Sequence, residues 1–334
     1  MESPEPMPVP GLLSVVVPLC NEEESLLALK DEILAALGKL PDWKLQLIFV
    51  DDGSTDESWT RIREMASGDP RITGLRFRRN FGKAAALEAG FRIAKGEIVF
   101  TMDADLQDDP NELPKFLDAI RAGKDLVSGY KQKRKDPWHK VFPSRVFNGA
   151  VSFLTGVKLH DHNCGYKAYR AGVIRELRLY GELHRFVPVL AASKGYKVGE
   201  VVVKHRARKF GRSKFGPKRF IKGFLDLLQV SFVTTFGYRP MHFFGSTALL
   251  AWFLAAGGLA LFAFSVILYW FGAMGDFYPL SLLAITLALM LFGSQALLAG
   301  YLAELVTAQR KDDPFSIAER TPTPVPAGVA DAVA

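Results

Sequence analysis

The sequence predicts an α/β fold with a mostly parallel sheet flanked by helices, followed by a transmembrane hairpin of two helices. Short apolar runs alternate with helical patterns through the first two thirds of the chain, which is typical of strand–helix–strand units. The last third instead holds two long uncharged stretches. The 334 residues suffice for one large domain or two smaller ones.

Five apolar runs are the candidate strands. The first, SVVV, precedes Asn21 and three glutamates, which are typical of a capped helix start. Ser54 is the candidate cap of the helix after the second run. Because ligands of parallel sheets bind beyond the carboxyl ends of the strands, the residues after each run form the candidate site. The runs lie at residues 14–17, 45–50, 72–77, 97–102 and 125–129.

Two uncharged stretches, at residues 240–275 and 277–303, each exceed the roughly 20 residues that a helix needs to cross a bilayer. Two buried helices of a soluble core are the alternative. Lysine and arginine precede the first stretch and follow the second, so both termini and the sheet domain are expected in the cytoplasm of a multi-pass plasma-membrane protein. The preceding PKRFIKGFLDLLQVSF has basic and apolar faces at helical spacing and is expected to lie along the membrane interface.

The composition points to an anionic partner. The net charge is +7 and the pI is near 9.3, which suits phosphates, nucleic acid or an acidic membrane surface. Cys20 and Cys164 have no metal-ligand spacing and are expected to be thiols of a reducing compartment. The first ten residues lack the basic start and apolar core of a signal peptide, so the N-terminus is expected to stay cytoplasmic.

The stretch FTMDADLQDD places like charges directly after an apolar run. Asp103 and Asp105 are two residues apart, so in extended chain they point to the same side. Two carboxylates suit Mg²⁺ or Mn²⁺, whose shell diphosphate oxygens and water would complete. The alternative is a loop of solvated carboxylates that caps a helix at Asn111.

Two more polar strand ends fall beside this one in the predicted sheet. In VDDGSTDES, Gly53 permits a sharp turn, and Asp52 is expected to accept hydrogen bonds from a nucleotide base or ribose. An ordinary capped turn is the alternative for this segment. PLCNEEESL adds a third strand end, with Pro18 and Glu22 near the same edge.

The motifs resemble those of family 2 inverting glycosyltransferases. They run in the family's order as VVVPLCNEEESL, IFVDDGSTD, RNFGKAAALEAGF, GEIVFTMDADLQDDP and HNCGYKAYR, and the likeness covers roughly residues 12–310. Within the family the chain is similar to the polyprenyl-phosphate sugar transferases, the group of dolichol-phosphate mannose synthase and bacterial undecaprenyl-phosphate glycosyltransferases. The resemblance implies a GT-A-like nucleotide-sugar-binding sheet, a UDP- or GDP-linked sugar donor, a polyprenyl phosphate acceptor, and Mg²⁺ or Mn²⁺.

The resemblance also implies roles for single residues around the donor. The metal set it implies is Asp103, Asp105 and Gln107. The nucleotide set is Pro18, Glu22 and Asp52. Two departures weaken parts of the pattern: Cys20 stands where relatives often have an aromatic, and Lys167 stands where many have arginine, which would bind phosphate less well.

Basic residues are expected to bind the phosphates of donor and acceptor. A phosphate monoester has a second pKa of about 6, so it is largely anionic near neutral pH and needs positive charge rather than a base. The segment KHRARKFGRSKFGPKRFIK supplies such charge before the membrane, although plain attraction to anionic lipid is the alternative. The residues that match the family's phosphate-binding positions are Lys131, Arg145, Arg212 and Lys214.

The resemblance places Asp161, Asp105 and Arg212 at the reacting groups. Asp161, in LHDHNCGY, matches an acidic position near the acceptor, where it would orient the acceptor or act as a base; a turn-capping aspartate is the alternative. The expected divisions are a disordered N-terminus at 1–11, a glycosyltransferase domain at 12–215, juxtamembrane amphipathic helices at 216–238, two transmembrane helices at 239–310, and a disordered tail at 311–334.

The expected activity is metal-dependent, inverting transfer of a sugar to a polyprenyl phosphate, in cell-envelope glycan synthesis. A processive polysaccharide synthase is the nearest alternative, although the QxxRW motif of those enzymes is absent. A non-catalytic membrane protein that binds nucleotide sugars is a second. Nucleic-acid binding would rest on basicity alone and is not expected. A second copy of the chain is a candidate partner.

Overall fold

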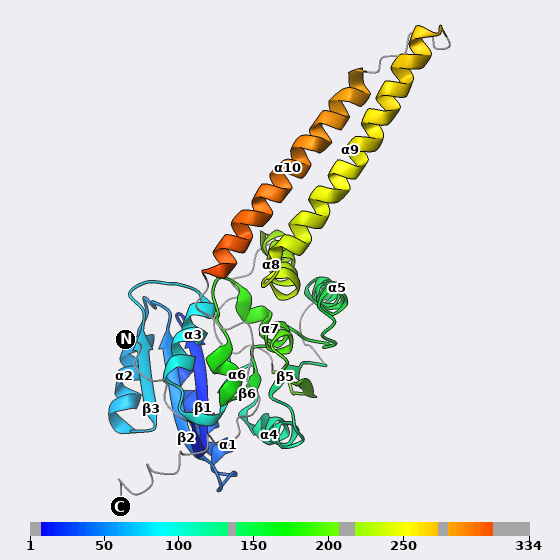
Figure 1. Cartoon of the computed structure of the whole chain (residues 1–334). Helices are drawn as coiled ribbons and strands as arrows, with labels where there is room; N and C mark the ends of the chain where they lie inside the picture. The colour runs from blue at the N-terminus through cyan, green and yellow to red at the C-terminus, as the bar shows by residue number, and fades with distance from the viewer. Residues whose placement is uncertain (1–7, 133–137, 207–217, 273–279, 310–334) are drawn as a thin grey trace, which may run out of the picture.

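The computed structural model describes residues 8–132, 138–206, 218–272 and 280–309, except for the side chains of residues 138–145 and 218–222. A layered domain of strands and helices carries a long pair of helices that projects away from it (Figure 1). The expected α/β domain followed by an apolar helical hairpin is thus what the chain forms.

The sheet has seven strands in the order β3-β2-β1-β4-β6-β5-β7. Every neighbouring pair is parallel except those of β6, which runs antiparallel to β4 and β5. All five predicted runs are strands; β6 and β7 were not predicted. The strands are β1 (Val9–Leu19), β2 (Lys44–Asp51), β3 (Ile72–Arg76), β4 (Gly96–Thr101), β5 (Leu126–Tyr130), β6 (Lys167–Arg170) and β7 (Val198–Val202).

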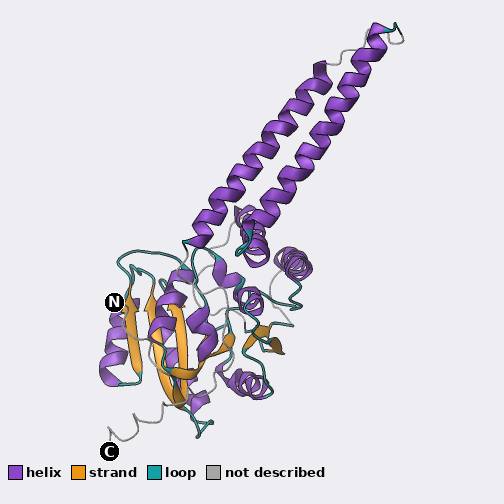
Figure 2. Cartoon of the chain, in the orientation of Figure 1, coloured by secondary structure: helices purple, strands orange, loops and turns teal. Residues whose placement is uncertain are grey.

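Helices cover both faces of the sheet (Figure 2). Alternate residues of β1 separate the two layers, because Val15 and Val17 join one buried cluster whereas Val16 joins the other. On the first face lie α1 (Leu26–Leu37), α2 (Ser58–Gly68), η1 (Pro110–Glu112) and α4 (Leu113–Arg121). On the second lie α3 (Lys83–Ile93), α5 (Trp138–Thr155), α6 (Ala171–Glu176), η2 (Leu183–Arg185), α7 (Val187–Ser193) and α8 (Lys218–Phe236).

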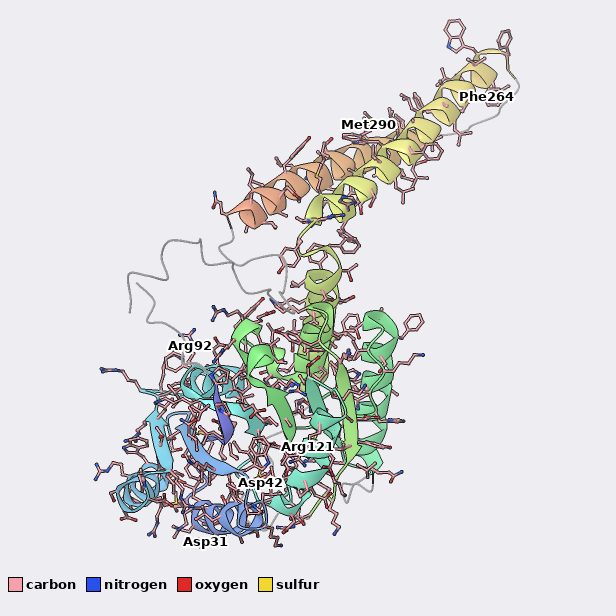
Figure 3. The ribbon with its side chains drawn as sticks, turned by 60° about the horizontal axis from the view of Figure 1, so that its bottom comes forward. Asp31, Asp42, Arg92, Arg121, Phe264 and Met290 are labelled. Carbon is pink, nitrogen blue, oxygen red and sulfur yellow. The ribbon has the colours of Figure 1, made fainter. Side chains whose placement is uncertain are left out.

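The hairpin consists of α9 (Pro240–Trp270) and α10 (Leu280–Ala308). Both helices are long and apolar enough to cross a membrane, and only 17% of the most apolar window of each is buried. Two helices in a soluble core would be mostly buried, so that alternative does not fit. Phe264 and Met290 illustrate the exposed apolar surface, since both lie on the hairpin outside the sheet domain and are exposed (Figure 3).

Small residues allow the two hairpin helices to approach closely. A Cβ on Gly258 would lie 2.4 Å from the Thr286 hydroxyl, and one on Gly293 would lie 2.6 Å from the Trp252 ring. The Trp252 indole N–H donates to the Met290 carbonyl at 3.3 Å. Close approach of this kind is how helices associate where the surroundings are as apolar as the side chains.

Helix α8 meets the base of the hairpin. Its Leu227 and Val230 are buried against the domain, whereas Phe224, Leu225 and Leu228 are exposed. Its last turns also join an aromatic cluster with the start of α9, in which ring centroids lie 5.2–5.8 Å apart. The exposed apolar face supports the expectation that this helix lies along a membrane interface, which stays a prediction.

Gly90 sets the distance between α3 and the sheet. A Cβ at this position would lie 2.3 Å from Cγ1 of Val16, a branched side chain in the packed core. We expect Gly90→Ala to lower the free energy of unfolding by about 1–3 kcal/mol, the usual cost of overpacking. Thermal unfolding of the full chain in detergent measures this as a lower midpoint.

Gly149→Ala is the matched control, because Gly149 also lies in a helix and a Cβ there would meet nothing within 4 Å. We expect it to leave the midpoint unchanged or raise it slightly. In a Val16→Ala background the cost of Gly90→Ala should shrink, since the clashing methyl group is gone. Equal effects of the two alanine substitutions would contradict this account of the α3 packing.

Candidate active site

A cavity of about 210 Å³ opens at the carboxyl ends of β1, β2 and β4, beside the start of α3. Four acidic side chains line it, together with one basic side chain among the described lining residues, Lys83. The ends of three strands therefore line one cavity, as the sequence predicted. The lining residues are Pro18, Leu19, Cys20, Glu22, Asp52, Lys83, Ala86, Asp103, Ala104 and Asp105.

Asp52 holds the loop that leads into α3. Its two carboxylate oxygens accept hydrogen bonds from the backbone N–H groups of Phe81 and Gly82, at 2.6 and 2.9 Å. Burial raises the pKa of the Asp52 carboxyl above its ordinary value, against the effect of these two bonds, and the neighbouring Asp51 raises it further. Gly82 itself has a φ of 93°, which a side chain would strain.

The predicted sharp turn at Gly53 is present. Its φ is 72°, and a Cβ there would lie 2.5 Å from the backbone of Arg79. Glycine is thus required both by the backbone conformation and by the close passage of the loop before α3. The turn brings Asp52 and this loop together at the cavity wall.

The predicted helix caps are wrong. Ser54 does not cap α2; its hydroxyl accepts from the N–H of Asn21 at 2.9 Å, and α2 begins after Glu57. Asn21 does not cap α1 either, since its side chain accepts from the N–H of Thr55 at 2.8 Å. Short polar side chains bond to whichever backbone group is near, and here the neighbour is the adjacent loop. These bonds tie the β1 and β2 loops together at the rim of the site.

Asp103 sits between Lys83 and the backbone of Gly165. The Lys83 ammonium donates to Oδ1 of Asp103, and a Cβ on Gly165 would lie 2.6 Å from Oδ2. Burial alone raises the pKa of the Asp103 carboxyl, but the charges of Lys83, Lys131 and Lys167 lower it to about 2. The carboxylate is therefore held ionised in the cavity wall.

The turn after β4 is strained. Leu106 has a φ of 60°, which is uncommon for a residue other than glycine, and strained residues of this kind cluster at functional sites. The turn allows the N–H of Gln107 to donate to Asp105 at 3.2 Å. The helical turn that follows is capped by Asp109, which accepts from the N–H of Asn111 at 3.0 Å.

The residues present fit a divalent cation only with help from a ligand. Asp103 and Asp105 share the cavity, whereas Gln107 does not line it. The side-chain amide of Gln107 instead donates to the backbone carbonyl of Arg206 at 3.3 Å. Within the described residues no group of three or more His, Cys, Asp or Glu could hold a metal. Two hard oxygen donors do suit Mg²⁺ or Mn²⁺ that takes its remaining ligands from phosphates and water.

Of the four predicted phosphate-binding residues, Lys131 has a described side chain, and it is not among the described residues that line the cavity. Lys131 forms a buried ion pair with Asp108 at 2.8 Å, and although burial lowers the pKa of its ammonium, the charge of Asp108 raises it above the ordinary value. The side chain of Arg145 lies outside the described residues. Arg212 and Lys214 lie there too.

The HNCGYKAYR segment lies behind Asp103, since Gly165 packs against the carboxylate of that residue. Asp161 is buried, and its carboxylate accepts from the N–H of Asn163 at 3.2 Å. Lys167 is buried as well and donates to the Cys164 carbonyl, and burial lowers the pKa of its ammonium. Lys167 therefore supports this loop from within the domain.

Arg206 ties the start of the basic segment to the acidic loop. Its guanidinium pairs with Glu32 at 2.5 Å and with Asp109 at 2.7 Å. Its backbone N–H donates to the Gln107 carbonyl at 3.0 Å. Arg206 is thus engaged within the domain, although it belongs to the basic segment KHRARKFGRSKFGPKRFIK that is expected to bind phosphates.

The sequence interpretation missed Lys83, the basic residue at the centre of the site. Lys83 lies in RNFGKAAALEAGF, where a single lysine in a helical pattern carries no spacing signal. A usable signal was its position, because a Gly-Lys pair at the start of a helix that follows a strand end places a cation at the same edge as the carboxylates.

Comparison with known proteins places these features in a family. A family model described as glycosyl transferase family 2 matches residues 14–178. A dodecaprenyl-phosphate galacturonate synthase of Rhizobium johnstonii is 38% identical over 311 residues, which are 90% of this chain and 89% of that one. An undecaprenyl-phosphate 4-deoxy-4-formamido-L-arabinose transferase of Edwardsiella ictaluri is 35% identical over 294 residues, with coverages of 88% and 89%.

Solved structures share the fold. Glucosyl-3-phosphoglycerate synthase from Mycobacterium tuberculosis, in complex with Mn²⁺, UDP and phosphoglyceric acid, superposes with a TM-score of 0.51 at 18% identity, over 67% of this chain and 78% of that one. Its complex with Mg²⁺ and UDP gives a TM-score of 0.50 at 21% identity, with coverages of 65% and 79%. At such identity the likeness concerns the fold alone.

The two thiols differ in burial, and we expect them to differ in reactivity. Burial raises the pKa of the Cys164 thiol to about 12, whereas Cys20 is partly exposed in the cavity wall. Because the thiolate is the reactive form, we expect iodoacetamide at about pH 8 to label Cys20 alone in the native chain. Mass spectrometry should find the second label only after denaturation, and Cys20→Ser should take up none while folded. Rapid native labelling of Cys164 would contradict this placement.

Proposed function

The chain belongs to glycosyl transferase family 2, and on that premise we propose that it transfers a sugar from a nucleoside-diphosphate donor to a polyprenyl phosphate at a membrane. The observation that carries the proposal is the convergence of Asp103 and Asp105 on a cavity that Glu22 and Asp52 also line. Support for the acceptor comes from relatives named for dodecaprenyl- and undecaprenyl-phosphate products, which match nearly the whole chain at 38% and 35% identity.

The donor nucleotide lies across the ends of β1 and β2 in this proposal. Pro18, Glu22 and Asp52, the residues expected there, all line the cavity. Asp52 already accepts two backbone hydrogen bonds, but a carboxylate has about four acceptor positions, so it keeps capacity for a ribose or base. The donor nucleotide in this proposal is UDP or GDP.

Asp103 and Asp105 are the residues that would hold Mg²⁺ or Mn²⁺, the ions of the solved complexes with the same fold. When bound there, the ion neutralises charge on the departing diphosphate. Gln107 contributes indirectly in this proposal. Its backbone N–H donates to the Asp105 carboxylate, and its side-chain amide donates to the backbone carbonyl of Arg206. It therefore fixes the turn on which Asp105 stands.

The acceptor needs positive charge rather than a base. An oxygen of the anionic polyprenyl phosphate attacks the anomeric carbon on the face opposite the diphosphate; the new C–O bond forms as the bond to the nucleoside diphosphate breaks, and the configuration inverts. Lys131, Arg145, Arg212 and Lys214 are the proposed phosphate-binding residues. Asp161, which is buried, orients the acceptor side of the site in this proposal.

In this proposal the hairpin holds the reaction at a lipid surface. We propose that α9 and α10 cross the plasma membrane and that the sheet domain and both termini are cytoplasmic. Arg239 directly precedes α9, and Arg310 and Lys311 follow α10, which is the charge bias that the positive-inside rule associates with the cytoplasmic side. The basic segment before α8 would then meet a headgroup at the membrane surface.

The direct test of the activity is product analysis. Membranes that contain the full chain are incubated with polyprenyl phosphate and a panel of UDP- and GDP-sugars. The masses of the extracted lipids are then measured by mass spectrometry. We expect one donor to yield a polyprenyl phosphate heavier by a single sugar residue. Multiple sugar additions would indicate a processive synthase, and the absence of any glycolipid with every donor would reject sugar transfer to this acceptor.

Asp105→Ala tests the metal assignment. We expect sugar transfer to fall about a hundredfold to a thousandfold, as for loss of a group that stabilises transition-state charge. Folding in membranes should be retained, because Asp105 lies in a loop at the cavity wall. Asp118→Ala, at an exposed position of α4, is the control and should retain full activity.

Removal of divalent ions with a chelator should abolish transfer, and Mg²⁺ or Mn²⁺ should restore it. Full turnover after chelation would overturn the metal assignment.

A further inference from the structure

Lys83 is the one basic side chain among the described residues that line the cavity, and it is bonded to a carboxylate that the donor-bound state needs. Lys83 and Asp103 are each about one-third exposed, at 33%. The pair is therefore neither a solvated surface bridge nor a sealed core bridge. It stands where an arriving ligand can reach both partners.

The root of Lys83 is fixed. Lys83 is the first residue of α3, and the two preceding residues are held by Asp52 through their N–H groups. About two helical turns further along α3, Gly90 packs directly on Val16 of β1. The start of α3 therefore stays in place relative to the strand ends, and only the flexible lysine side chain is free to turn within the cavity.

The Asp103 carboxylate, which bonds to Lys83 through Oδ1, is blocked on its opposite side. It lies against Gly165, where even a Cβ would come within 2.6 Å of the carboxylate. The carbonyl of Gly165 accepts a hydrogen bond from the Thr101 hydroxyl of β4 at 2.7 Å, which keeps this backbone against the sheet. A cation that approaches Asp103 from the cavity therefore has to share the carboxylate with the Lys83 ammonium or displace it.

Sharing is unfavourable, because a divalent cation and an ammonium on one carboxylate repel each other at short range. A displaced ammonium needs a new anionic partner in the same cavity. The diphosphate of a nucleotide supplies one, and its oxygens also complete the shell of Mg²⁺ or Mn²⁺. Displacement is thus favourable when the two ligands arrive together and unfavourable when the metal arrives alone.

We infer that Lys83 is a built-in counter-cation of Asp103 that is exchanged for the divalent ion only as it turns to the donor's diphosphate, so that metal and nucleotide bind as a pair. The inference rests on the proposed function and adds to it that the metal and the nucleotide bind together. Free metal binds poorly to the resting protein, and the nucleotide raises the affinity for metal. By linkage, the metal raises the affinity for the nucleotide by the same factor.

The test measures Mn²⁺ binding rather than turnover. Mn²⁺ is titrated into the purified full chain in detergent, and free Mn²⁺ is followed by its electron paramagnetic resonance signal, first alone and then with saturating UDP or GDP. Solutions of Mn²⁺ and nucleotide without protein serve as blanks. For the wild type we expect the better nucleotide to raise the Mn²⁺ affinity at least about tenfold, within the usual range of coupling between two ligands.

Lys83→Met should separate the two effects. We expect it to bind Mn²⁺ without nucleotide at least about tenfold more tightly than the wild type, to bind the nucleotide more weakly, and to lose most of the coupling. Lys83→Arg keeps the charge and should restore most of the coupling. Lys95→Met removes an exposed lysine elsewhere in the domain and should match the wild type in every measurement.

The possible results distinguish this inference from the function on which it rests. If sugar transfer is found but Lys83→Met and the wild type bind Mn²⁺ alone equally well, the counter-cation role is wrong and the proposed function stands. If the wild type binds Mn²⁺ tightly without nucleotide, the exchange is also wrong. If neither Mn²⁺ nor either nucleotide binds the wild type under any condition, both the inference and the proposed donor site fall.

Discussion

The crowding of carboxylates at the carboxyl edge of the sheet is the constraint around which the loops are arranged. Like charges that are partly removed from water destabilise the fold unless each has a partner. Here the partners come from different elements, so that the neutralisation of charge also fixes the loops against one another. The pairs are Asp51 with Arg76, Asp52 with the N–H groups of Phe81 and Gly82, Asp103 with Lys83, Asp108 with Lys131, and Asp109 with Arg206.

Much of the architecture could be predicted because it depends on local patterns. The buried run SVVV and the four runs that follow it are apolar enough on both faces to indicate strands of a covered sheet, and each is a strand in the structure. The hairpin followed from the length of its uncharged stretches. The convergence of Asp52 with Asp103 followed from topology, since parallel strands end at one edge.

The rest depended on contacts between distant segments, which no local pattern encodes. β6 has only four residues and runs antiparallel, and its sequence KAYR has the apolar content of a loop. The caps failed because Ser54 and Asn21 bond to each other's loops across 33 residues of sequence. Lys131 was expected at a phosphate, but the position of Asp108 beneath it could not be foreseen from spacing. Lys83 was overlooked for the same reason.

The length of the hairpin has a consequence for how the enzyme would sit in the bilayer that we propose it crosses. α9 has 31 residues, so at the rise of an α-helix it is about 46 Å long, against a hydrocarbon thickness of about 30 Å. Such a mismatch is relieved when helices lean or when one end stands clear of the lipid. The aromatic cluster between α8 and α9 joins the helix expected to lie flat to the one expected to cross. A thinner or thicker bilayer would therefore change the lean of the hairpin and, through this joint, the height of the sugar-transfer site above the lipid headgroups.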